Sequence, residues 1–248
     1  MKAVSVRELN SLTPEQFQQI ISGPADEAAR WLHAAAEHGI VEAQVHYAQR
    51  LLDGIGVPLD RQEAFQWFKL AAGQDHVMAM NMMGRCYENG WGVPVDMLLA
   101  TYWFRLAAHA GLDWGMYNYA TALALGRGVA VSRQEALIWL RKATEMGHVK
   151  SWNLLGGFYE DGWIGAVDME AAFACYRKAA DGGDFRGQFN CGRVLALCNL
   201  VEQAVAWIGR AYYNRDATAA FREKLLSFLT RSDQPELKEF GLSLQKSA

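Results

Sequence analysis

The chain has 248 residues, of which 24 are Lys or Arg and 27 are Asp or Glu, so its formal net charge is −3. This balance provides no basic surface for nucleic acid and no attraction to an anionic membrane. Hydrophobic residues make up 51% of the chain, which excludes disorder, and no apolar run approaches the roughly 18 residues of a membrane span. The N-terminal residues lack the apolar core of a secretory signal, and the cysteines show no metal-site spacing. Together these features predict a reduced, cytoplasmic chain.

The first predicted helix spans residues 13–22. Thr13 is a favourable N-cap residue, Pro14 suits the first helical position, and Gly23-Pro24 ends the helix. The following residues, up to residue 40, have the apolar spacing of the second half of a 36-residue unit, which is described below and recurs along the chain. We therefore expect residues 1–40 to form a capping helix and an incomplete repeat.

A unit of 36 residues then repeats four times without gaps. Its clearest mark is a Gly-x-Gly loop, and Gly54 recurs at Gly90 (90 − 54 = 36) and again at Gly126. A disturbed copy follows at Gly162, where Ile164 replaces the second loop glycine. These positions predict four repeats, which span residues 41–76, 77–112, 113–148 and 149–184.

Each unit is predicted to contain two helices. In its first half, apolar residues fall at i, i+4, i+5 and i+8, as in Ala43, Tyr47, Ala48 and Leu51. In its second half they fall at i, i+3, i+4 and i+7, as in Ala64, Trp67, Phe68 and Ala71, and the large rings are expected to fill the space between units. Asp60 and Glu63 have the spacing of a capping box at the start of the second helix.

One position of the first helix carries only small residues, which predicts a close approach of the partner helix. Its members are Ala48, Gly84, Ala120, Gly156 and Gly192. After residue 184 the pattern continues as a degenerate repeat with a shortened loop over residues 185–216. Two further amphipathic helices over residues 217–248 are expected to cap the open end of the stack.

The repeat resembles the Sel1-like repeat, a relative of the tetratricopeptide repeat. The second unit matches best, with Ala79, Met83, Gly84, Tyr87, Gly90, Gly92, Val93, Asp96, Ala100, Trp103, Phe104, Ala107, Ala108 and Gly111 in the family pattern. The resemblance implies an all-α fold, a right-handed α-solenoid of stacked helix-turn-helix repeats. It also implies an adaptor or scaffold rather than an enzyme.

The residues themselves predict no catalytic site, no metal site and no cofactor. Each Gly-x-Gly follows a helix instead of a strand and lacks a third glycine, unlike a dinucleotide-binding loop. The histidines do not share a helical turn at metal-ligand spacing. Cys191 and Cys198 lie seven apart and are interpreted as free thiols, although their redox state stays open.

The first-helix positions opposite the apolar stripe are the candidate partner-binding residues, on the concave side of such solenoids. Amides can bond a peptide backbone, aromatic rings supply contact area, and arginines favour an acidic ligand. The alternative is that these side chains are only solvated, or pack between neighbouring first helices. The candidates are Asn81, Arg85, Trp114, Tyr117, Thr121, Asn153, Arg186, Phe189 and Arg193.

A second candidate surface consists of Trp91 and Trp163, which share one loop position two units apart. Exposed tryptophans suggest a contact surface, while packing of the loop onto a neighbouring unit is the alternative. We therefore expect another protein or an extended, acidic peptide as the partner, with no nucleic acid and no membrane. The rival functions are a tightly bound regulatory subunit of an enzyme, and an enzyme or metalloprotein with its site in the groove.

Overall fold

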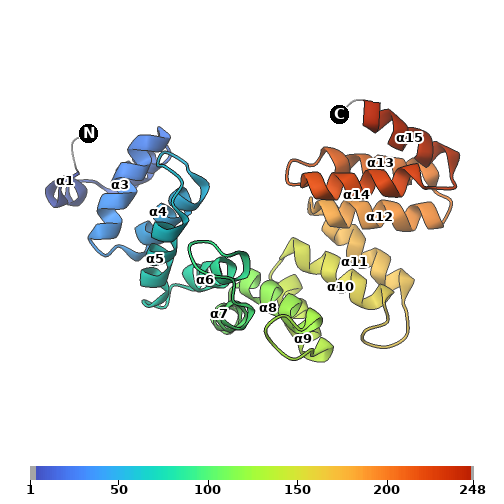
Figure 1. Ribbon diagram of the computed structural model, residues 1–248, viewed down its shortest axis with the longest axis horizontal. Coiled ribbons are helices and arrows are strands. Elements are labelled where there is room, and N and C mark those ends of the chain that lie inside the picture. Colours follow the sequence, from blue (N-terminus) through green and yellow to red (C-terminus); the bar gives the residue numbers. More distant parts are fainter. Residues whose placement is uncertain (1–3, 247–248) are drawn as a thin grey trace. The chain divides into compact units, whose positions relative to one another are not determined.

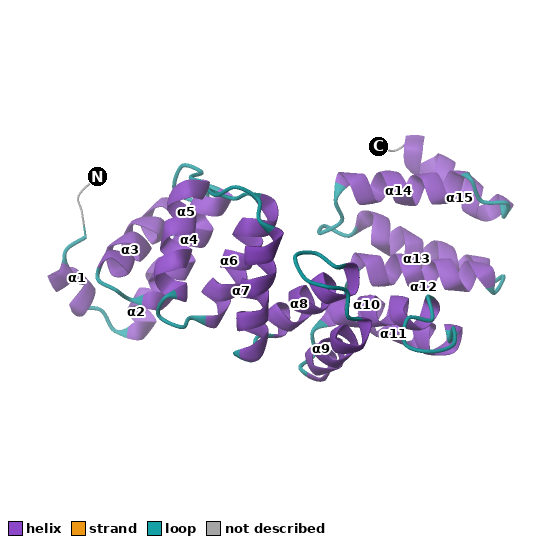
Figure 2. Cartoon of the chain, turned by 60° about the horizontal axis from the view of Figure 1, so that its bottom comes forward, coloured by secondary structure: helices purple, strands orange, loops and turns teal. Residues whose placement is uncertain are grey.

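The computed structural model describes residues 4–246, and every regular element in that range is a helix (Figures 1 and 2). The chain divides into two compact units, residues 1–132 and 133–248. No helix within residues 4–246 combines the length and the apolar character needed to cross a bilayer. The predicted all-α fold is confirmed.

The first unit contains eight helices in its described residues; α1 contacts α3, and from α2 onward each helix packs mainly against its neighbours along the chain. Such nearest-neighbour packing is typical of a repeat array. The helices are α1 (Val6–Asn10), α2 (Pro14–Ile21), α3 (Ala25–Glu37), α4 (Val41–Asp53), α5 (Arg61–Ala72), α6 (Val77–Asn89), α7 (Met97–His109) and α8 (Asp113–Leu125).

The second unit, over its described residues 133–246, contains seven helices. They are α9 (Arg133–Glu145), α10 (Val149–Glu160), α11 (Met169–Asp181), α12 (Phe185–Leu197), α13 (Val201–Tyr213), α14 (Ala219–Thr230) and α15 (Pro235–Lys246). Helices α14 and α15 pack on each other and on α13, and their Leu225, Leu229, Leu237 and Leu244 are buried in one core cluster. The two terminal helices expected from the sequence are present, and both bury apolar faces.

Helix ends follow the sequence signals closely. Thr13 and Gln16 form the reciprocal capping box of α2. Asp60 caps α5 by accepting hydrogen bonds from the backbone amides of Gln62 and Glu63. The capping box expected of Asp60 and Glu63 does not form, because Glu63 Oε1 instead accepts a 3.1 Å hydrogen bond from Trp67 Nε1.

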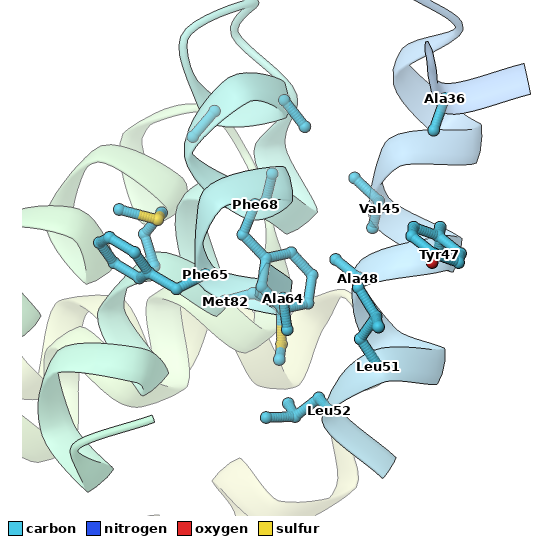
Figure 3. Close-up of a cluster of buried hydrophobic side chains, with 14 of the residues drawn as sticks. Ala36, Val45, Tyr47, Ala48, Leu51, Leu52, Ala64, Phe65, Phe68 and Met82 are labelled. Atoms are coloured by element: carbon cyan, nitrogen blue, oxygen red, sulfur yellow. The ribbon is translucent and has the colours of Figure 1, made fainter. Parts of the chain in front are cut away.

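The core of the first unit lies between the first and second helices of each repeat. Figure 3 shows Val45, Ala48, Leu51 and Leu52 of α4 on the side that faces Phe68 of α5. The predicted stripe Ala43, Tyr47, Ala48 and Leu51 is entirely buried. Trp67 and Trp103 are only partly buried, so the rings that fill the core are those of the adjacent Phe68 and Phe104.

The small residues of the first helix allow the predicted close approach. A Cβ atom added to Gly84 would lie 2.5 Å from the ring of Phe104, and one added to Gly156 would lie 2.5 Å from the ring of Tyr176. Both distances are far below van der Waals contact. The second helix of the same repeat therefore occupies the space that a side chain would need.

Successive repeats also meet backbone to backbone at the second glycine of each loop. A Cβ on Gly92 would lie 2.2 Å from the carbonyl oxygen of Arg61, and one on Gly128 would lie 1.9 Å from that of Met97. These carbonyls belong to the first residue of the second helix in the preceding repeat. At Ile164 this glycine is missing, and α10 accordingly ends in a different turn, with Asp161 as its C-cap.

Candidate partner-binding surfaces

The nine candidate residues opposite the apolar stripe lie on the first helices α6, α8, α10 and α12. We call the side chains of these helices that lie outside the buried stripe the first-helix face. Helices α6 and α8 carry this face in the first compact unit, and helices α10 and α12 carry it in the second.

Two predicted amides are engaged between neighbouring first helices. Asn81 is only 3% exposed, and its Oδ1 accepts a 2.8 Å hydrogen bond from Asn118 Nδ2. Asn153 is half-buried, and its Oδ1 accepts a 2.9 Å hydrogen bond from Asn190 Nδ2. Sequence reasoning missed Asn118 and Asn190, although both pairs share a spacing of 37 residues (118 − 81 and 190 − 153). Each amide therefore joins two repeats, and a role toward a peptide stays a prediction.

In the first unit, α8 carries an aromatic part of the first-helix face. Trp114 is 38% exposed, and its ring meets the half-buried ring of Tyr117 edge-on, with centroids 6.4 Å apart. Thr121 lies one turn further along, where its Oγ1 donates a hydrogen bond to the carbonyl of Tyr117. The i, i+3, i+7 spacing places all three residues along one side of α8.

Arg85 of α6 is exposed, and its guanidinium lies 4.8 Å from the centroid of the Trp91 ring. The contact joins a residue of the first-helix face to the loop tryptophan of the same repeat. Cation–π contacts of this kind hold a side chain in place while its charge still faces water. Trp91 itself is half-buried and packs against the core cluster of the first unit.

In the second unit, Arg193 belongs to a hydrogen-bond network across three helices. Glu160 Oε2 accepts a 2.5 Å hydrogen bond from Arg193 Nη2 and a 2.6 Å bond from the hydroxyl of Tyr176. The hydrogen bond from Arg193 is the main reason why the pKa of Glu160 is lowered, while partial burial opposes the shift. The charge of Arg193 is therefore largely neutralised within the chain.

Phe189 and Arg186 of α12 have different surroundings. The ring of Phe189 is half-buried against Phe221 and Phe228 of α14, at centroid distances of 5.8 and 5.3 Å. Arg186 is exposed, with its guanidinium 4.5 Å from the Phe185 ring centroid. Of the two, Arg186 presents the accessible group. Phe189 mainly joins the last repeat to α14.

The second loop tryptophan, Trp163, is also half-buried. Its ring packs edge-on against Phe158 with centroids 5.1 Å apart, and the guanidinium of Arg133 lies 4.2 Å from the ring centroid. Arg133 is the first residue of α9, in the preceding repeat. In the other repeats, the first residue of the preceding second helix contacts the second loop glycine, as Arg61 contacts Gly92. Here the corresponding residue, Arg133, contacts the ring of Trp163 instead, so the loop still packs on the preceding repeat although it lacks that glycine.

The described residues, 4–246, contain no group of three or more His, Cys, Asp and Glu side chains arranged to hold a metal ion. Three of the four cysteines are buried and unpaired, and burial raises their pKa to about 12 for Cys86 and about 11 for Cys175 and Cys191. Cys198 is unpaired and exposed. The buried thiols are therefore protonated, which is the unreactive form.

The Sel1 repeat family model matches residues 25–40, 41–76, 77–112, 115–148 and 153–184. A Sel1 repeat protein from Oxalobacter formigenes is 26% identical, with a TM-score of 0.77 over 94% of this chain and 99% of that one. The protective antigen c5321 of uropathogenic Escherichia coli, which has an SLR fold, is 24% identical over 97% of this chain, with a TM-score of 0.68. This chain spans 54% of c5321.

The immunity protein Pa5087 from Pseudomonas aeruginosa is 17% identical, with a TM-score of 0.56 over 84% of this chain and 82% of that one. At this identity, as for c5321, the likeness concerns the fold alone. No curated protein matches the chain. Because the family model covers more than half of the sequence and the helices stack as its repeats require, the chain belongs to the Sel1 repeat family.

Proposed function

We propose that this chain is a non-catalytic adaptor or scaffold that binds a segment of a partner protein on its first-helix face. Sel1 repeat proteins generally mediate protein–protein interactions, and their fold is typically non-catalytic. The observation that carries the proposal is the partly exposed Trp114, edge-on to Tyr117 on α8. Tryptophan, tyrosine and arginine are the residues that most often dominate binding energy at interfaces.

The charge of the partner segment follows from which arginines are accessible. Arg193 is paired with Glu160, so it adds little attraction for a ligand. Arg85 and Arg186 are exposed and lie over aromatic rings, where they are ordered without losing their charge. An acidic segment is the expected ligand, with Arg85 as its main electrostatic contact on the first unit. Arg186 is the corresponding accessible charge for a segment bound on the second unit.

The unpaired cysteines support a reducing compartment as the place where the chain works. All four are free, and three are buried within helices. Disulfides are common in oxidising compartments and rare in reducing ones.

The test begins with peptides selected from a random-peptide phage library on the intact chain, followed by titration of each selected peptide against variants. Trp114→Ala should reduce affinity by about fivefold or more, as truncation of an interface aromatic does. Arg85→Glu should weaken binding more at low salt than at high salt, because salt screens exposed charges. Tyr213→Ala is the matched control, since Tyr213 is an exposed aromatic outside the first-helix face.

Circular dichroism of each variant checks that the helices are retained. The proposal is wrong if every selected peptide binds Trp114→Ala and Arg85→Glu as tightly as the parent chain. Loss of binding confined to Trp91→Ala or Trp163→Ala would instead identify the loops as the recognition surface.

A further inference from the structure

A pocket of about 160 Å³ opens in the first unit, away from the first-helix face. Its lining comes mainly from α7, with one residue of α8 and the loop that follows α8. We call it the α7 pocket, and its principal lining residues are Leu98, Thr101, Tyr102, Arg105, Tyr119 and Val129.

The repeat itself suggests why this space is open. Phe65 of α5 holds the position equivalent to Thr101, one repeat earlier (101 − 65 = 36). The ring of Phe65 is 5% exposed and packs edge-on against Tyr87 of α6, with centroids 5.6 Å apart. Figure 3 shows Phe65 pointing to the side of α5 away from α4. Threonine has no ring to place there, and Phe173 restores one two repeats after Thr101.

The mouth of the α7 pocket is apolar. Leu98 is 70% exposed and Tyr102 is 45% exposed. The preceding repeat has Gln62 and Gln66 at the same two positions. Exposed apolar side chains gathered around a pocket are typical of a binding surface, because they gain free energy only when a partner covers them.

The wall of the pocket is held in place before any partner binds. Thr101 Oγ1 donates a 2.6 Å hydrogen bond to the carbonyl of Arg127, which ties the loop to α7. The backbone of the next residue, Gly128, contacts the backbone carbonyl of Met97, the first residue of α7. A preformed pocket costs little ordering entropy when it is filled.

Arg105 sets the charge next to the pocket. Its guanidinium lies 5.9 Å from the ring centroid of Tyr102, and within residues 4–246 it has no carboxylate at ion-pair distance. The sequence of α7 contains no Asp or Glu. The pocket therefore combines space for an apolar side chain with an available positive charge.

We propose that the α7 pocket binds an aromatic side chain of a partner protein, with an Asp or Glu beside it in the partner sequence that pairs with Arg105. The ring takes the place that Phe65 fills within the preceding repeat. This inference goes beyond the proposed function, because none of the α7 pocket residues belongs to the first-helix face.

The experiment compares two substitutions of the same residue. Peptides are selected from a random-peptide phage library on the parent chain after depletion on Thr101→Phe, which supplies the missing ring. We expect enrichment of peptides with an aromatic residue next to Asp or Glu. Their affinity should fall about tenfold or more on Thr101→Phe and change by less than about twofold on Thr101→Ser, which keeps both the space and the hydrogen bond to the carbonyl of Arg127.

Further variants distinguish binding at the α7 pocket from binding at the first-helix face. Arg105→Glu should weaken binding most at low salt, and Trp114→Ala should leave these affinities unchanged. If Thr101→Phe loses its helical circular dichroism, Leu98→Gln with Tyr102→Gln replaces it as the test variant. The same loss of binding is then expected, and retention of binding overturns the proposal.

The proposal is also overturned if no peptide survives the depletion, or if the survivors bind Thr101→Phe as tightly as the parent chain. A third contrary result is self-association of the parent chain in sedimentation velocity that Thr101→Phe abolishes. In that case the occupant is a second copy of this chain.

Discussion

Asn118 donates a hydrogen bond of 2.8 Å from its side-chain amide to Oδ1 of Asn81, across two neighbouring repeats. Two repeats later, Asn190 makes the same bond to Asn153. Thirty-six residues earlier along the chain, the positions equivalent to Asn81 and Asn118 hold Val45 and Met82 (81 − 36 and 118 − 36), which are both buried in the core cluster of the first unit. The same pair of repeat positions is therefore occupied by hydrogen-bonded amides in one place and by buried apolar side chains in another.

This comparison predicts how the amide pair responds to substitution. Asn118→Met removes the donor and leaves the buried oxygen of Asn81 without it, which should cost about 1–3 kcal/mol of unfolding free energy. The double variant Asn81→Val with Asn118→Met copies the apolar pair and should lie within about 1 kcal/mol of the parent chain. Urea unfolding of the three proteins measures both values. A double variant as unstable as the single one would show that the two contacts are not equivalent.

Alanine substitutions at two loop glycines, Gly92 and Gly111, should distinguish the cost of backbone strain from the cost of a steric clash. Gly92 and Gly111 both have positive φ, of 75° and 89°, but a Cβ on Gly111 would meet nothing within 4 Å. Gly111→Ala should therefore cost only the strain of the left-handed region, about 1–2 kcal/mol. Gly92→Ala should cost at least about 2 kcal/mol more, because its Cβ would collide with the carbonyl of Arg61. Thermal unfolding should rank the two variants, and equal costs would contradict the backbone contact between repeats.

Glu160 should make the second unit sensitive to acid. Its pKa in the folded chain is lowered from 4.5, mainly by the hydrogen bond from Arg193. Ionised Glu160 therefore stabilises the folded chain fully at a pH above its pKa in the unfolded chain. This stabilisation is lost as the pH falls through its lower pKa in the folded chain. Glu160→Gln should cost about 1–2 kcal/mol at neutral pH. That difference from the parent chain should shrink as the pH is lowered.

The control for Glu160 is Asp181→Asn, which breaks an exposed i,i+4 pair with Arg177. Exposed pairs contribute little, so its cost should be under about 0.5 kcal/mol. Denaturant unfolding at several pH values distinguishes the two variants. A difference between Glu160→Gln and the parent chain that is constant with pH would exclude the proposed linkage.

The cysteines should differ sharply in reactivity toward a chromogenic aromatic disulfide. Only Cys198 is exposed, and burial keeps the pKa of Cys86, Cys175 and Cys191 at about 11 or higher. At mildly alkaline pH the native chain should release one equivalent of chromophore quickly, and the remainder only after denaturation. Cys198→Ser should abolish the fast phase. A fast thiol remaining in that variant would mean that the helices around a buried cysteine open readily.

The repeat architecture could be predicted from the sequence because its signals are local and occur several times. Ala43, Tyr47, Ala48 and Leu51 lie on one helical face wherever the helix packs, and all four are buried. The small residues at Gly84 and Gly156 indicated a close helix contact without identifying the opposing ring. The sequence predicted that the large rings of the second helix fill the space between units; of the adjacent pair in α7, Phe104 is buried and Trp103 only partly so, whereas Trp139 at the same position one repeat later is buried.

The partners of the candidate site residues could not be predicted in the same way. Asn81 pairs with Asn118 at a spacing of 37 residues, not 36, because neighbouring first helices are offset by one position where they touch. Trp163 is covered by Arg133 from the preceding repeat, 30 residues earlier in the chain. The sequence determines the period, the helices and their buried faces, since these depend on φ, ψ and apolar spacing within one segment. The offset between two packed helices belongs to neither sequence segment alone, so only the tertiary structure decided which side chains are paired and which remain accessible to a partner.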